Sequence, residues 1–168
     1  MELKTYLLAQ LDREAAQTRK TIARVADPGS DFKPHERSME LNYLAALVAT
    51  MPGWIAMMID RDELNLDDPA SEGFRTKVRT SQDDLLAAHD AAVADARRAL
   101  ESTSDEHLLT PWAFKMHGQV VSKEPRYVMI ADAVFSHLAH HRGQLTVYLR
   151  LNEAPVPALY GPSADERF

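Results

Sequence analysis

The chain has 168 residues, of which 45% are hydrophobic and 26% charged, an ordinary composition for one domain that can bury a full core. Its formal net charge of −6 argues against a nucleic-acid-binding surface, and the absence of cysteine excludes disulfides and a protein thiolate nucleophile. We find no apolar run near about 18 residues and no signal-peptide core, so we expect a cytoplasmic protein without a transmembrane helix.

The first half of the chain predicts two long helices. Apolar positions recur at helical spacing from about residue 3 to residue 25, and Asp27-Pro28-Gly29-Ser30 ends this segment. A second amphipathic segment runs from residue 39 to about residue 60 and contains Pro52-Gly53. Because proline removes a helical hydrogen bond, we expect a kink there.

The second half predicts two more helices around an irregular stretch. Ser81 and Asp84 have the spacing of a capping box and open a third helix that runs to about Leu100. Residues 104–125 predict an irregular segment or a short hairpin, and the last helix spans about residues 125–151. The fold we expect is therefore all-α: a single-domain four-helix bundle with long connections and an irregular or hairpin segment before the last helix.

The most informative motif is a pair of histidines in the last predicted helix. His137 and His141 are four residues apart, so on a helix their Cβ atoms lie roughly 5–6 Å apart and both imidazoles can reach one metal ion. At about 100° per residue, the pair shares an apolar stripe with Val134, Leu138 and Leu145, and it points into the interior. A buried imidazole needs partners for its ring nitrogens. A metal ion is one such partner, and hydrogen bonds within the core are the alternative.

The residues beside the pair have separate expected roles. His140 points about 100° away from His141, and we expect it to be structural or exposed. Arg142 also points away, and we expect it to pair with a carboxylate elsewhere in the fold or at a dimer contact. Gln144 lies nearer the face of the pair and can bond a ring nitrogen in support of a metal site.

Several motifs together resemble the DinB/YfiT-like superfamily over nearly the whole chain. They are Met51-Pro52-Gly53-Trp54, Trp112, His137-x3-His141-Arg142-Gly143-Gln144, and the tail Tyr160-Gly161-Pro162-Ser163-Ala164-Asp165-Glu166. The resemblance implies a helix bundle, often a homodimer, with a divalent metal such as zinc, nickel or manganese held by three histidines. It also implies S-transfer with a low-molecular-weight thiol, or metal-dependent hydrolysis, acting on a small-molecule substrate.

One position departs from the family pattern. Alignment on the family's second helix puts Leu47 where the third histidine usually stands, and Leu47 cannot bind a metal. A catalytic zinc site normally has three protein ligands and a water. Three outcomes are therefore open: the site is lost, solvent or a carboxylate completes the shell, or another histidine takes the third place.

His89 is the best candidate for that third place. It lies in the middle of the apolar stripe of the third predicted helix, so it should be buried. We therefore predict His137, His141 and His89 as the metal ligands, with His89 facing the pair across the bundle. The alternative is a core histidine bonded to a backbone carbonyl or a tyrosine.

Two functions remain open from the sequence. In the first, a divalent metal on the His137/His141 pair polarises a substrate or lowers the pKa of a bound water or thiol. Any thiol would be a bound cofactor or substrate, since the chain has no cysteine. In the second, the bundle is a small-molecule binder or oligomeric scaffold without a competent metal. The intact pair favours the first function and Leu47 favours the second.

Overall fold

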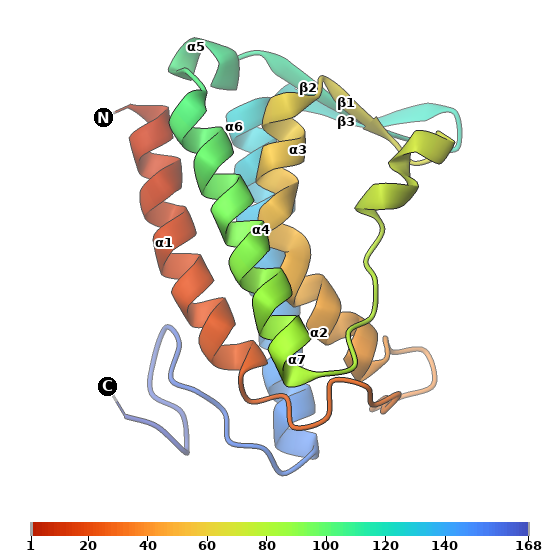
Figure 1. Cartoon of the computed structure of the whole chain (residues 1–168), viewed down its shortest axis with the longest axis vertical. Coiled ribbons are helices and arrows are strands. Elements are labelled where there is room, and N and C mark those ends of the chain that lie inside the picture. Colours follow the sequence, from red (N-terminus) through yellow and green to blue (C-terminus); the bar gives the residue numbers. More distant parts are fainter. Residues whose placement is uncertain (1, 168) are drawn as a thin grey trace.

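The computed structural model describes residues 2–167 and is mostly helical, with a small three-stranded sheet at one end of the helices (Figure 1). The α-helices are α1 (Leu3–Ile22), α2 (Leu41–Thr50), α3 (Trp54–Asp60), α4 (Gln82–Ser102), α5 (Asp105–Leu108), α6 (Arg126–Met129) and α7 (His137–Leu151). The other helical segments are the 3-10 turns η1 (Met51–Gly53) and η2 (Pro69–Phe74) and the π-helix η3 (Ile130–Ser136). The strands are β1 (Glu63–Asn65), β2 (Pro111–Met116) and β3 (Gln119–Pro125).

The long helices confirm the prediction from apolar periodicity. Helix α4 opens as predicted, with the Ser81 hydroxyl accepting a hydrogen bond from the backbone N–H of Asp84 at 3.2 Å. Helix α1 has no capping side chain of its own. Instead, the carboxylate of Asp105 accepts from the N–H groups of Leu3 and Lys4 at 2.8 and 2.9 Å. Asp105, about one hundred positions away, therefore satisfies backbone N–H groups that have no partner within the first turn of α1.

The second predicted helix is broken at the expected proline. Pro52 lies in η1, which separates α2 from α3. By length and hydropathy the segment Leu41–Asp60 could cross a membrane, with a mean hydropathy of 1.4, but 67% of this window is buried inside the structure. Its apolar composition is accounted for by its position in the core, where it packs against α4 and α7.

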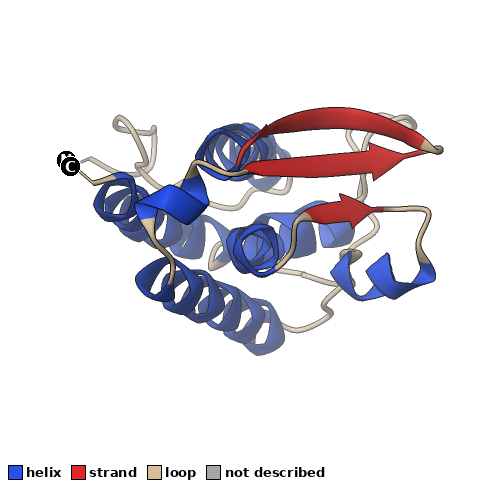
Figure 2. Ribbon diagram, turned by 90° about the horizontal axis from the view of Figure 1, so that it is seen from above, coloured by secondary structure: helices blue, strands red, loops and turns tan. Residues whose placement is uncertain are grey.

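The stretch before the last helix forms a hairpin, one of the two predicted possibilities, and pairs with an unpredicted strand, so the fold is mostly helical and not all-α as expected. Strands β2 and β3 pair antiparallel, and β1 pairs parallel with β2 through residues 63–65 (Figure 2). The hairpin turns at His117 and Gly118, whose φ angles are 53° and 70°. The Asp67 carboxylate accepts from both of their N–H groups at 3.1 and 2.8 Å, and these bonds lower the pKa of Asp67. The turn is therefore tied to the loop between β1 and η2.

A buried charge network ties α7 to α1 and to the C-terminal tail. The Arg142 side chain is 1% exposed and its Nη2 lies 2.6 Å from Oε2 of Glu14. Nη1 of Arg142 donates to the Glu14 carbonyl at 3.1 Å and to Oγ1 of Thr18 at 3.0 Å. The Tyr160 hydroxyl accepts from Arg142 and donates to Glu14 at 2.8 Å. The expectation that Arg142 pairs with a distant carboxylate is confirmed.

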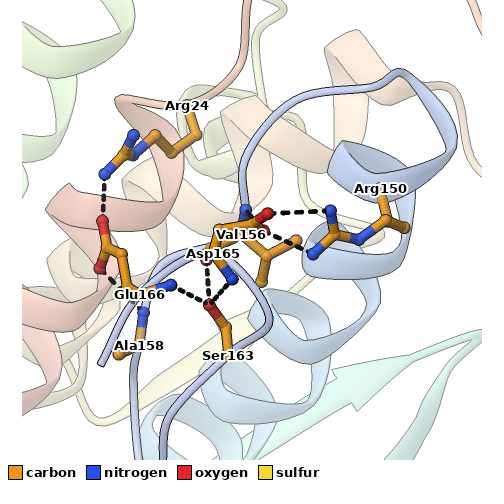
Figure 3. A network of polar contacts seen from close by, with 7 residues as sticks. All are labelled: Arg24, Arg150, Val156, Ala158, Ser163, Asp165 and Glu166. Atoms are coloured by element: carbon orange, nitrogen blue, oxygen red, sulfur yellow. Dashed lines mark hydrogen bonds and ion pairs between the residues drawn. The ribbon is translucent and has the colours of Figure 1, made fainter. Parts of the chain in front are cut away.

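The tail beyond α7 is not helical and is held by polar contacts (Figure 3). Glu166 pairs with Arg24, two residues after the end of α1, and Asp165 pairs with Arg150 of α7. The Ser163 hydroxyl accepts from the backbone N–H groups of both acids, at 3.1 Å for Asp165 and 2.9 Å for Glu166. The tail thus contacts both the first and the last helix of the chain.

We expect Arg142→Met to lower the free energy of unfolding by about 3–5 kcal/mol, because it leaves the Glu14 carboxylate buried without a counter-charge. Arg150→Met is the matched control. It removes a more exposed ion pair with Asp165, which water screens, and should cost much less stability. Urea unfolding followed by far-ultraviolet circular dichroism compares the two variants. Equally small losses would contradict a structural role for the buried pair.

Candidate functional site

The two histidines of the pair meet at the start of α7. Nε2 of His137 lies 2.7 Å from Nε2 of His141, and the ring centroids are 4.4 Å apart. His141 is 8% exposed, whereas His137 is only partly buried. The helical spacing of four residues therefore brings the two ring nitrogens together on the inner side of the helix.

Gln144 determines which nitrogen of His141 carries the proton. Nδ1 of His141 donates to Oε1 of Gln144 across 2.7 Å, as expected for a supporting residue. Burial lowers the pKa of His141, and the nearby His137 and His140 lower it further, against the opposing effect of the Gln144 bond. The neutral ring thus has its lone pair on Nε2, directed at His137. That lone pair can accept an N–H from His137 or share a cation with it.

His89 lies away from the pair. It is 1% exposed, its Nδ1 lies 3.0 Å from the carbonyl oxygen of Ala49, and its Nε2 lies 3.1 Å from that of Ala15. A neutral ring has one N–H and can donate to only one of these carbonyls, while its other nitrogen faces the second. The ring lies between α4, α2 and α1, which is the core arrangement left open as the alternative. The structure does not bring His89 together with His137 and His141, because its ring faces the carbonyls of two helices.

The protein supplies two donors for a metal at this place. Leu47 is 7% exposed and presents only an aliphatic side chain to the same cavity as His137. Within residues 2–167, no three histidine, aspartate or glutamate side chains are grouped so that they could hold an ion. Two imidazoles fit a divalent metal of borderline softness if solvent or a ligand fills its remaining positions.

A cavity of about 560 Å³ lies beside His137. Most of its lining is apolar and includes Trp54, Met57, Met58, Phe74, Trp112 and Phe114. The polar lining groups are Tyr43, Arg75, Thr76 and His137. The His137 ring also packs against Trp54, with 5.9 Å between the ring centroids. His137 therefore connects the imidazole pair to a mostly apolar pocket, in which it is one of four polar lining groups.

The π-helix η3 contributes to the shape of this pocket. Met129, Ala133 and His137 all line the cavity, each four residues after the previous one. In a regular α-helix, two such steps turn the side chain by about 80° around the axis. A π turn contains an additional residue and takes up part of that rotation, which keeps the three side chains on one face. Periodicity treated this segment as ordinary helix, so the π turn was not predicted.

Arg75 and Thr76 were also missed by the sequence analysis. They follow η2 in a segment without helix or strand, where side chains have no periodic pattern that would reveal burial or proximity to a pocket. Trp54 and Trp112 have a double role. Both pack in the core clusters and also form walls of the cavity.

Comparison with known proteins gives a family and a fold. The model of the DinB family matches residues 1–167. The fold is similar to that of a DinB-like protein from Bacillus cereus ATCC 10987, with a TM-score of 0.69 and 22% identity over 92% of this chain and 95% of the other. It is also similar to a DinB-like protein from Bacillus subtilis, with a TM-score of 0.64 and 18% identity over 90% and 96%. No curated protein matches this chain.

The placement of His89 predicts a loss of stability in acid. Burial lowers the pKa of His89, against the raising effect of the Ala49 and Ala15 carbonyls. An imidazole with a depressed folded-state pKa stabilises the fold above its unfolded-state pKa of about 6.5, and this contribution is lost as the pH falls. We therefore expect the free energy of unfolding to fall less between about pH 7.5 and 5.5 in His89→Gln than in the unmodified protein.

Urea unfolding at several pH values measures this difference. His140→Gln is the control, because it makes the same substitution at an exposed histidine. Identical pH dependence in His89→Gln and the unmodified protein would show that His89 takes up a proton equally in both states.

Proposed function

We propose that this chain, which belongs to the DinB family, binds a small and largely apolar molecule in the cavity beside α7 and recognises its polar group with the His137/His141 pair. The observation that carries this proposal is that His137 lines the cavity while its Nε2 meets that of His141. A volume of about 560 Å³ lies within the usual range for small-molecule sites. Such sites are typically apolar with a few polar groups that orient the ligand, which is the pattern of this lining.

A divalent metal is the proposed link between the pair and the molecule. His137 and His141 would hold it, and Gln144 supports this role because its bond to Nδ1 leaves the Nε2 lone pair of His141 available. Because Leu47 offers no donor, solvent or the bound molecule would complete the shell. When bound, such an ion polarises an oxygen or lowers the pKa of a water or thiol, the chemistry of hydrolysis or thiol S-transfer.

The thiol in such a transfer reaction would have to come from outside the protein. The chain contains no cysteine, so a low-molecular-weight thiol would bind as cofactor or substrate. The apolar walls of the cavity would hold the acceptor molecule, and His137 would face its reacting group. A homodimer, a cytoplasmic location and a single domain over residues 1–168 stay predictions from the sequence.

A second candidate function is ligand binding without a metal. The separation of 2.7 Å between the two Nε2 atoms is also that of a hydrogen bond, with one ring donating and the other accepting. Leu47 favours this candidate, since it takes the place of a third donor. The pair would then contact the polar group of the ligand directly, and the protein would serve as a binding module.

Metal content distinguishes the two candidates. We expect untagged protein equilibrated with zinc, nickel or manganese to hold near-stoichiometric metal by elemental mass spectrometry, and His137→Gln to hold none. Gln144→Leu should weaken metal binding by about 10–100-fold, because a ligating imidazole loses its orienting partner. His140→Gln is the matched control on the same helix and should bind metal normally.

The opposite result has a defined meaning. Background metal in the unmodified protein, together with binding of a small apolar molecule that weakens in His137→Gln, would replace the metal proposal by the second candidate. Normal metal content in His137→Gln would exclude the pair as the site.

A further inference from the structure

We infer that the molecule bound in the cavity is a small amphipathic anion, whose apolar body lies against the aromatic walls and whose charged group pairs with Arg75. This inference rests on the proposed function and names the class of its ligand. Of the described residues that line the cavity, Arg75 is the one with a permanent charge. A single fixed cation beside apolar walls selects ligands that carry one anionic group.

The segment that holds Arg75 is basic in an acidic protein. The chain has a net charge of −6, whereas residues 73–80 contain Arg75, Lys77 and Arg79 and no acidic residue. The Arg61 guanidinium lies over the Phe74 ring at 4.6 Å from its centroid, which adds another positive charge beside a wall of the cavity. Arg75 pairs with Glu72 and Arg79 with Asp84, so the segment and these two partners together carry one net positive charge.

The ion pair that Arg75 forms within the protein leaves it able to bind a ligand. Nε of Arg75 lies 2.7 Å from Glu72, and the two side chains are 61% and 73% exposed. Ion pairs this exposed contribute little, because water screens them. The contact uses Nε, so the Nη groups can donate in parallel to a carboxylate or sulfonate.

Thr76 extends the anion site. It lines the same cavity as Arg75 and carries a hydroxyl that can donate to the same group. Phe74, the residue directly before Arg75, also lines the cavity. An aromatic or aliphatic body held between Phe74 and Trp54 would then have its anionic group at Arg75 and its other end toward His137.

Two dyes that differ by one sulfonate test this inference directly. N-phenyl-1-naphthylamine is neutral, and 1-anilinonaphthalene-8-sulfonate is the same molecule with an anionic group. We expect the unmodified protein to bind the sulfonate at one per chain and about tenfold more tightly than the neutral dye, as measured by fluorescence titration and calorimetry at low salt. Arg75→Gln should abolish the preference, and Arg75→Lys should retain part of it.

Lys77→Gln is the matched control, since it removes the same charge from the same segment at a residue outside the cavity lining. Equal affinities for the two dyes, or a preference that survives in Arg75→Gln, would overturn the anion site while leaving the cavity as a binding site. Failure of both dyes to bind at one per chain would overturn the proposed function and this inference with it. Thermal unfolding of each variant confirms that these exposed substitutions leave the fold intact.

Discussion

The buried ion pair between Arg142 and Glu14 determines how α7 faces the rest of the molecule. Adjacent helical residues point about 100° apart, so holding the Arg142 side chain against α1 turns its neighbour His141 away from α1 and toward the cavity side. Rotating α7 would separate a buried charge from its partner at a cost of several kcal/mol. The position of the imidazole pair thus depends on a contact made on another face of the same helix.

The features that could be predicted from the sequence are local ones. Helix spacing and the cap at Ser81 are encoded within a few residues, and so is the reach of Gln144 to His141 one turn earlier. Strand β1 could not be predicted, because three residues hold too little pattern and their partner lies about fifty positions later. The π turn was hidden for another reason: it changes the number of residues per turn without changing which residues are apolar.

The histidines show where periodicity stops being informative. It placed His89 and His141 correctly in the interior, where both are buried. Burial fixes the need for hydrogen-bond partners but does not say whether those partners are carbonyls, side chains or an ion. For His89 the partners are backbone carbonyls of two other helices, and their positions follow only from the assembled fold. The position of Arg75 could not be predicted for the same reason. It lies in a segment without regular structure, which reaches the cavity only through tertiary packing.

The segment that carries Arg75 also has a kinetic consequence. From Thr76 to Thr80 it forms no backbone–backbone hydrogen bond with the rest of the described chain, although it runs alongside the helices from η2 to the start of α4 (Figure 1). Its displacement therefore breaks few interactions and leaves the helices folded. Local fluctuations of residues 76–80 would then occur on a timescale far shorter than global unfolding. Amide hydrogens of this segment would exchange with solvent long before those of α4.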